Sequence, residues 1–178
     1  ISKYFIDTLP NCADSRPPVY ADKTAAGTYA GMPYGLAAGT GYNSGTVAAP
    51  GNVSLIGSKF RVQNAPTDLY NYASVLFCIA EASKLGWITG TPDDVAAKAA
   101  YDAGIAASMS QHGISGAPAT AYAAQPSIVY KPAKAIAQII YQKYVANFMG
   151  YSYETWTDWR RTNFPALVPA PAAYTNPK

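Results

Sequence analysis

The chain has 178 residues, which is enough for one domain with its own hydrophobic core. Charged residues make up only 13% of it and the net charge is +3; with no basic run longer than Arg160–Arg161, this argues against nucleic-acid binding. No apolar run is long enough to span a bilayer, and 14 Gly, 14 Pro and 15 Tyr predict a loop-rich, folded protein.

Residues 1–65 show little helical periodicity and are predicted to be loop-rich. Residues 1–9 fit either a short strand or the end of a helix, and residues 11–20 are rich in turn-forming Asn, Asp, Ser and Pro. Unevenly spaced glycines follow between residues 27 and 57, interleaved with Tyr29, Tyr34 and Tyr42. A flat tyrosine ring can stack on the apolar face of a sugar, so these three are the candidate ligand-binding residues. The alternative, that they pin a long loop to the body, stays open.

Residues 66–164 are predicted to form a four-helix body. The first helix runs over 66–85, with Thr67 or Asp68 as its cap and Gly86 ending it. Its 3,4-spacing predicts a buried face made of Leu69, Tyr72, Ala73, Leu76, Phe77, Ala80 and Ser83. The second helix begins in the sequence Thr-Pro-Asp-Asp at 91–94 and reaches about Gln111. Its predicted packing face consists of Val95, Ala99, Ala103, Ile105, Ala106 and Met109.

The second half of this body begins after a predicted loop at 113–131. A third helix opens at Pro132 and ends at Gly150, with an apolar stripe of Ile136, Ile139, Ile140, Tyr144, Val145 and Phe148. A fourth helix covers about 152–161, and residues 165–178 are predicted to be an irregular tail rich in Pro and Ala. Antiparallel helix pairs would bury such stripes, so the predicted fold class is mainly α with long irregular loops.

The fourth helix holds the densest group of aromatic and charged residues in the chain. Trp156 and Trp159 are three positions apart and share a face; they either pack on the preceding helix or present a ring to a ligand. Glu154 and Asp158 lie on one helix surface, which suits ion pairs with Arg160, Arg161 or Lys143 better than the two-sided cleft of a glycosidase. Glu81, late in the first helix, is interpreted as a structural or solvated side chain.

Catalytic and metal-binding patterns are absent from the sequence. His112 is the single histidine and is assigned to a helix end. With Cys12 and Cys78 as the only cysteines, a zinc site is not expected, and no nucleophile motif with a placed base exists. We therefore predict no enzyme activity, no catalytic residue, no metal and no cofactor. Cys78 is predicted to be a buried free thiol; the two cysteines neither require nor exclude a disulfide.

Several segments carry a family resemblance. Residues 139–150 (IIYQKYVANFMG) and 154–169 (ETWTDWRRTNFPALVP) closely resemble the C-terminal signature of the SusD/RagB-like proteins, although Tyr144 and Asn163 stand where Trp and Gly are common. Residues 73–86 (ASVLFCIAEASKLG) are similar to a second family helix. Residues 101–109 are similar to a third, and residues 14–20 with 31–35 resemble a family loop. The resemblance covers most of the chain.

The resemblance implies a tetratricopeptide-related α–α superhelix, of which residues 1–178 would be the C-terminal portion of a single domain. It also implies a non-catalytic, surface-exposed outer-membrane lipoprotein of Bacteroidota. Such a protein binds a glycan or another nutrient and acts with a SusC-like TonB-dependent transporter. The anchoring cysteine would lie outside this chain. The family motif residues are scaffold, so no site residue is carried over.

Three hypotheses of different classes follow. The leading one is a glycan- or nutrient-binding component of an outer-membrane uptake system. The alternative is a helical-repeat module that binds a protein partner and no small molecule. A glycosidase is the third reading; it would require turnover that is abolished by Glu154→Gln.

Overall fold

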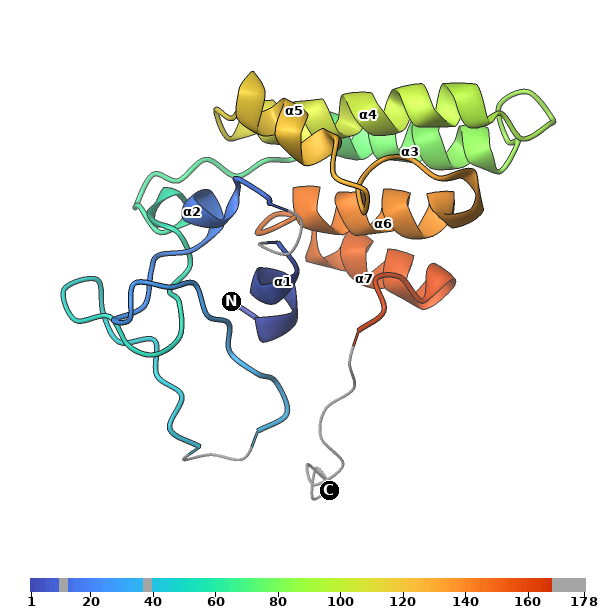
Figure 1. Ribbon diagram of the computed structural model, residues 1–178. Helices are drawn as coiled ribbons and strands as arrows, with labels where there is room; N and C mark the ends of the chain where they lie inside the picture. Colours follow the sequence, from blue (N-terminus) through green and yellow to red (C-terminus); the bar gives the residue numbers. More distant parts are fainter. Residues whose placement is uncertain (10–12, 37–39, 168–178) are drawn as a thin grey trace, which may run out of the picture. The chain divides into compact units, whose positions relative to one another are not determined.

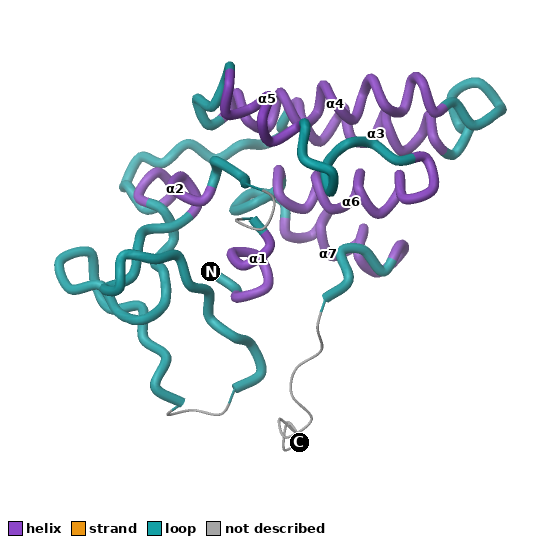
Figure 2. Tube along the Cα trace, in the orientation of Figure 1, coloured by secondary structure: helices purple, strands orange, loops and turns teal. Residues whose placement is uncertain are grey.

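The computed structural model describes residues 1–9, 13–36 and 40–167. Helices are the only regular elements of these residues (Figures 1 and 2), apart from isolated β-bridges such as that between Ser2 and Met32. The predicted mainly α class is therefore confirmed. Residues 1–65 and 66–166 form two compact units. From residue 168 on, the predicted irregular tail lies outside the described residues.

The first unit consists mostly of loops (Figure 2), with two short α-helices, α1 (Lys3–Thr8) and α2 (Pro17–Tyr20), and the 3-10 turn η2 (Ser58–Phe60). Residues 1–9 thus adopt the helical one of the two predicted alternatives. Ser2 caps α1 by accepting a hydrogen bond from the Phe5 amide. Before α2, Asp14 and Arg16 form a fully buried ion pair with 2.6 Å between Oδ2 and Nη2, which satisfies both charges away from water.

The second unit is built on the antiparallel pair α3 (Tyr72–Lys84) and α4 (Asp94–Gln111), which lie side by side in Figure 1. Gly104 in α4 lets the two helices approach closely, because a Cβ at this position would lie 2.6 Å from the Phe77 ring. At the end of α3, Gly86 has a φ of +74°, as its predicted helix-ending role requires. The side chain of Asp93 starts α4 by accepting hydrogen bonds from the Val95 and Ala96 amides.

Three further helices complete this unit. The short α5 (Ala117–Ala123) contacts α4, and the turn η3 (Pro132–Lys134) leads into α6 (Ala135–Ala146), which packs against α3 and α4. The last helix, α7 (Ser152–Thr162), packs on α6, and its predicted bounds are confirmed within one residue. Asn163 ends it in the left-handed conformation, with a φ of +58°. None of the described helices is long and apolar enough to cross a membrane.

The start of α3 differs from the sequence prediction. The helix begins six residues later than Pro66, because Asn71 is its cap: the Asn71 side-chain oxygen accepts a hydrogen bond from the Ser74 amide. Leu69 and Tyr72, predicted to be buried, are 90% and 68% exposed. The 3,4-spacing continues through this segment although the backbone is not helical there. The rest of the predicted face is buried: Ala73, Leu76, Phe77, Ala80 and Ser83.

Two other predictions were wrong. The predicted packing face of α4 holds for Ile105 and Met109 but not for Val95, Ala99, Ala103 and Ala106, which are exposed. Instead, the helix buries Ala97, Ala100, Tyr101, Gly104 and Ser108. Because eight of the 18 residues of α4 are Ala or Gly, the sequence does not distinguish one apolar face of this helix from another. The second error is α5, which lies in a segment predicted to be loop.

Candidate binding surfaces

The three candidate tyrosines belong to the first unit, and the structure separates them into two groups. Tyr34 and Tyr42 are exposed, at 40% and 45%, and both lie near the start of α1, Tyr34 near Tyr4 and Tyr42 near Lys3. Tyr29 is half-buried, and its burial together with the nearby Asp22 charge raises the pKa of its phenol. The structure therefore brings two of the three toward α1.

The loop that carries Tyr42 is closed by two asparagine side chains. Asn52 Oδ1 accepts a hydrogen bond from the Asn43 amide (2.8 Å), and its Nδ2 donates to the Gly41 carbonyl (2.9 Å). Asn43 Oδ1 accepts from the Gly45 amide (2.8 Å). These bonds fix the backbone on both sides of Tyr42, so its half-exposed ring is held on an ordered turn.

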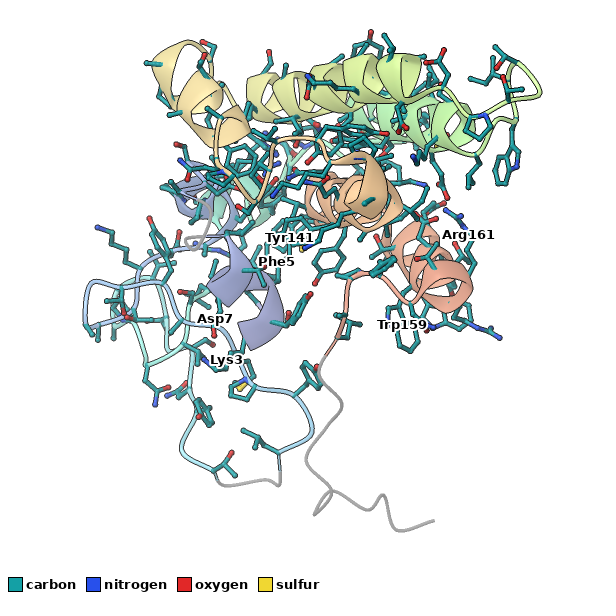
Figure 3. All side chains as sticks on the ribbon, turned by 45° about the vertical axis from the view of Figure 1, so that its right-hand side comes forward. Lys3, Phe5, Asp7, Tyr141, Trp159 and Arg161 are labelled. Carbon is teal, nitrogen blue, oxygen red and sulfur yellow. The ribbon has the colours of Figure 1, made fainter. Side chains whose placement is uncertain are left out.

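The loop that carries Tyr29 and Tyr34 is attached to the beginning of the chain. The Met32 amide donates to the Ile1 carbonyl (2.7 Å) and the Lys3 amide donates to the Met32 carbonyl (2.8 Å). Gly31 is needed here, because a Cβ would clash with the Lys3 backbone. On α1 itself, Lys3 and Asp7 form a surface ion pair (Figure 3) that raises the pKa of the Lys3 ammonium through its hydrogen bond and charge.

The charged residues of the fourth predicted helix form a structural cluster in the second unit. Lys143 Nζ lies 2.8 Å from Asp158 Oδ2, and Arg161 Nη2 lies 2.7 Å from Asp158 Oδ1. Arg161, labelled on α7 in Figure 3, also pairs with Glu81 of α3. Asp158 and Glu81 are buried, and each is neutralised by a cation. The predicted ion pairs of Asp158 are confirmed, and the cluster ties α7 to α3 and α6.

The two tryptophans of α7 differ in exposure. Trp156 is 50% exposed and carries the Arg160 guanidinium 4.7 Å from its ring centroid, whereas Trp159 is half-buried. The alternative in which both tryptophan rings pack on the preceding helix is therefore wrong for Trp156. Glu154 is exposed on the same helix.

The second unit also has a groove that the sequence did not reveal. Its volume is about 650 Å³, and it lies between the segment before α3, α3 itself and the second half of α4. Its aromatic rim is formed by Tyr70 and Tyr72, which are 69% and 68% exposed. The remaining lining residues are Asp68, Asn71, Ala73, Leu76, Ala103, Ala106, Ala107, Ser110 and Gln111.

The groove was missed because the helix prediction placed Tyr72 in the core. Asn71 carries the signal that would have corrected it, since Asn is a preferred N-cap and begins the helix at Tyr72. Residues 66–70 would then have been assigned to an extended segment, with Tyr70 at its end and Tyr72 at the start of the helix both exposed.

The remaining predictions concern metal and thiol chemistry. No group of three or more metal-binding side chains occurs within residues 1–9, 13–36 and 40–167. His112 stands at the C-cap of α4, the helix end to which it was assigned. Cys78 is a free thiol but half-buried instead of buried, and Cys12 lies outside the described residues.

The structure is thus that of a mainly helical protein. It has exposed tyrosines on its loops, and buried ion pairs join the helices of its second unit. Residues 1–178 match the family of SusD-like proteins described as starch-binding and associating with the outer membrane. The chain belongs to this family. SusD-like proteins are binding proteins and not enzymes, and they are generally associated with the outer membrane.

Two solved structures have the same fold. One is a SusD homologue from Bacteroides fragilis, with 23% identity over 97% of this chain and a TM-score of 0.77; the other is a chitin-binding protein, with 24% identity over 96% and a TM-score of 0.75. The chain spans 42% and 39% of their lengths. No curated protein matched the chain.

Proposed function

We propose that the protein containing this chain binds a glycan at the cell surface and delivers it to a SusC-like TonB-dependent transporter of the outer membrane. The proposal is supported by the family match over residues 1–178 and by the family description, which names starch binding and the outer membrane. The protein would be held as a surface lipoprotein by a lipid on a cysteine outside this chain, as in Bacteroidota members of the family.

The observation that carries the proposal at the level of residues is the pair of exposed rings, Tyr34 and Tyr42. The turn that carries Tyr42 is closed by the side chains of Asn43 and Asn52, and Tyr34 follows the backbone bonds that join Met32 to Ile1 and Lys3. A half-exposed ring on an ordered loop offers one flat apolar face to a pyranose with little loss of entropy. We assign ligand contact to these two tyrosines. Tyr29, half-buried beside Asp22, is assigned to anchoring the loop.

Calorimetric titration of the full-length protein with neutral oligosaccharides tests this assignment. Replacing both Tyr34 and Tyr42 by Ala is expected to weaken binding by about tenfold or more, since an aromatic stacking partner contributes about 0.5–1.5 kcal/mol. Tyr153→Ala is the matched control, because Tyr153 is 79% exposed on α7. Unchanged affinity in the double variant would remove these rings from the site. The oligosaccharide should be recovered intact.

The transporter is tested separately, by purifying the tagged full-length protein from native outer membranes and identifying what accompanies it. A large TonB-dependent barrel as the dominant partner supports the uptake proposal. A soluble protein in its place, together with no glycan binding, would instead favour the helical-repeat interaction module.

A further inference from the structure

The groove between α3 and α4 combines three features of a ligand site. Its volume of about 650 Å³ falls within the roughly 300–1,000 Å³ of small-molecule sites. Its floor is apolar and shallow, formed by the side chains of Leu76 and four alanines. Its rim is aromatic on one side, with Tyr70 and Tyr72, and polar on the other, with Ser110 and Gln111.

The aromatic rim is held in place before any ligand arrives. The Tyr70 ring meets the Tyr151 ring edge-on, at 6.4 Å between centroids and an interplanar angle of 85°. Asn71, between the two rim tyrosines, is buried: its Oδ1 accepts from the Ser74 amide (2.6 Å), and its Nδ2 donates to the Ala146 carbonyl (3.3 Å). The backbone that presents both rings is thus fixed to α3 and α6, although the rings themselves are exposed.

The polar rim is also ordered. Gln111 Nε2, in the last turn of α4, donates a hydrogen bond to the Asp68 carboxylate, which joins the two sides of the groove at one end. A carboxylate accepts hydrogen bonds from hydroxyl groups, and the Ser110 hydroxyl can both donate and accept. Asp68 is the only charged residue in the lining.

This chemistry selects a class of ligand. Tyrosine faces opposite hydroxyl-binding polar groups suit a sugar ring, which has an apolar face and a hydroxyl-bearing edge. The single negative charge in the lining disfavours an anionic sugar, because its carboxylate would approach Asp68 with no cation in the lining to compensate. We propose that the groove binds an uncharged oligosaccharide, as a second subsite besides the Tyr34–Tyr42 loops. This inference rests on the proposed function, since it assumes that the protein binds a glycan.

Titration of the full-length protein with neutral malto- and chito-oligosaccharides, and with an oligouronate of the same length, tests the groove. The variant with Tyr70→Ala and Tyr72→Ala is expected to lose about tenfold in affinity for the neutral ligand, and Gln111→Ala several-fold from the opposite rim. Tyr153→Ala is the control. The wild type should prefer the neutral oligomer, and Asp68→Asn should reduce this preference.

The outcomes separate the two proposals. If the Tyr34 and Tyr42 variants lose binding while the groove variants bind as wild type, the groove is not a subsite and the proposed function stands. If no oligosaccharide binds to the wild type, the proposed function itself fails and the groove with it. If sedimentation shows self-association that Tyr72→Ala abolishes and oligosaccharide does not affect, the groove is a contact between copies, which overturns the inference.

Discussion

Arg161 in α7 forms a two-point ion pair with Glu81 in α3, although the residues are 80 positions apart in the chain. The Glu81 side chain is 6% exposed and that of Arg161 is 42% exposed. The hydrogen bonds to Glu81, and then those to Asp158, raise the pKa of the Arg161 guanidinium. The pair thus supplies the counter-charge of a buried carboxylate and attaches the last helix to the first one of its unit.

Arg161→Ala is expected to reduce the free energy of unfolding by about 2–3 kcal/mol. Removing one partner of a buried pair costs about 3–5 kcal/mol, and the partial exposure of Arg161 lowers this value. Arg160→Ala is the matched control and should cost only about 0.5–1 kcal/mol, for its cation–π contact with Trp156. Urea unfolding of the three proteins provides the comparison; equal losses in both variants would contradict the structural role of Arg161.

Gly104→Ala should destabilise the α3–α4 pair by about 1–3 kcal/mol, despite the higher helix propensity of Ala. The new methyl group would lie 2.6 Å from Cε1 of Phe77. In a double-mutant cycle with Phe77→Leu, the cost of Gly104→Ala is expected to shrink, since the rigid ring is gone. The same cost in both backgrounds would show that the ring is not the obstacle.

Asn71 has two functions that two substitutions can separate. Asn71→Ala removes both the cap of α3 and the bond to the Ala146 carbonyl, with an expected loss of about 1–2 kcal/mol. Asn71→Asp keeps an acceptor for the Ser74 amide but loses the Nδ2 donor. If the cap dominates, thermal unfolding should place the Asp variant close to wild type; if the link to α6 dominates, it should resemble the Ala variant.

The stabilising contribution of the Tyr130 hydroxyl should be lost at alkaline pH. This hydroxyl donates to Asp94 Oδ1 at 2.7 Å, and burial followed by this carboxylate raises its pKa above the ordinary value of 10.0. Above pH 10 the unfolded chain loses this proton before the folded protein does, so the free energy of unfolding falls as pH rises. Urea unfolding between pH 8 and 11 should show a steeper decline for wild type than for Tyr130→Phe. Parallel curves would contradict the assignment.

Asp94 is expected to make the free energy of unfolding fall as the pH is lowered into the acid range. Hydrogen bonds from Lys84 and then Tyr130 lower the pKa of its carboxyl below 3.8. Its contribution is therefore present above pH 3.8 and is lost as pH falls through the lower, folded-state pKa. Asp94→Asn should therefore lower the free energy of unfolding slightly at neutral pH, since the ion pair with Lys84 is partly exposed. In urea unfolding at a series of pH values from 7 down to 2, the curve of the variant should meet that of wild type in acid. A constant difference at every pH would contradict the assignment.

The sequence predicted those elements whose signals are local. Gly86 ended its helix as expected, and Ile139, Ile140 and Val145 of the predicted stripe were buried, whereas Ile136, Tyr144 and Phe148 were half-buried. The start of α3 was not predicted, because the apolar spacing continues past the residue where the backbone stops being helical. The face of α4 was not predicted either, because alanines on all sides leave the choice to the partner helix.

The candidate surfaces were predictable only in part. Tyr34 and Tyr42 stand on exposed loops, as a Gly-rich segment with interleaved tyrosines implies. The pairing of Glu81 with Arg161 depends on how α7 packs, which spacing within either helix cannot show. The groove depends on the shared ends of α3 and α4, so neither segment reveals it separately.

The position of the Glu81–Arg161 pair has a consequence for protein synthesis. On the ribosome, α3, α4 and α6 are made before α7, so Glu81 is synthesised 80 residues before its partner Arg161. In a nascent chain without α7, the charges of Glu81 and Lys143 lack their partners, and the surface of α6 that α7 covers is exposed. Transiently exposed apolar surface of this kind favours aggregation and is a target of chaperones. We therefore expect the helical unit to reach its full stability only after α7 has left the ribosome and packed on α6.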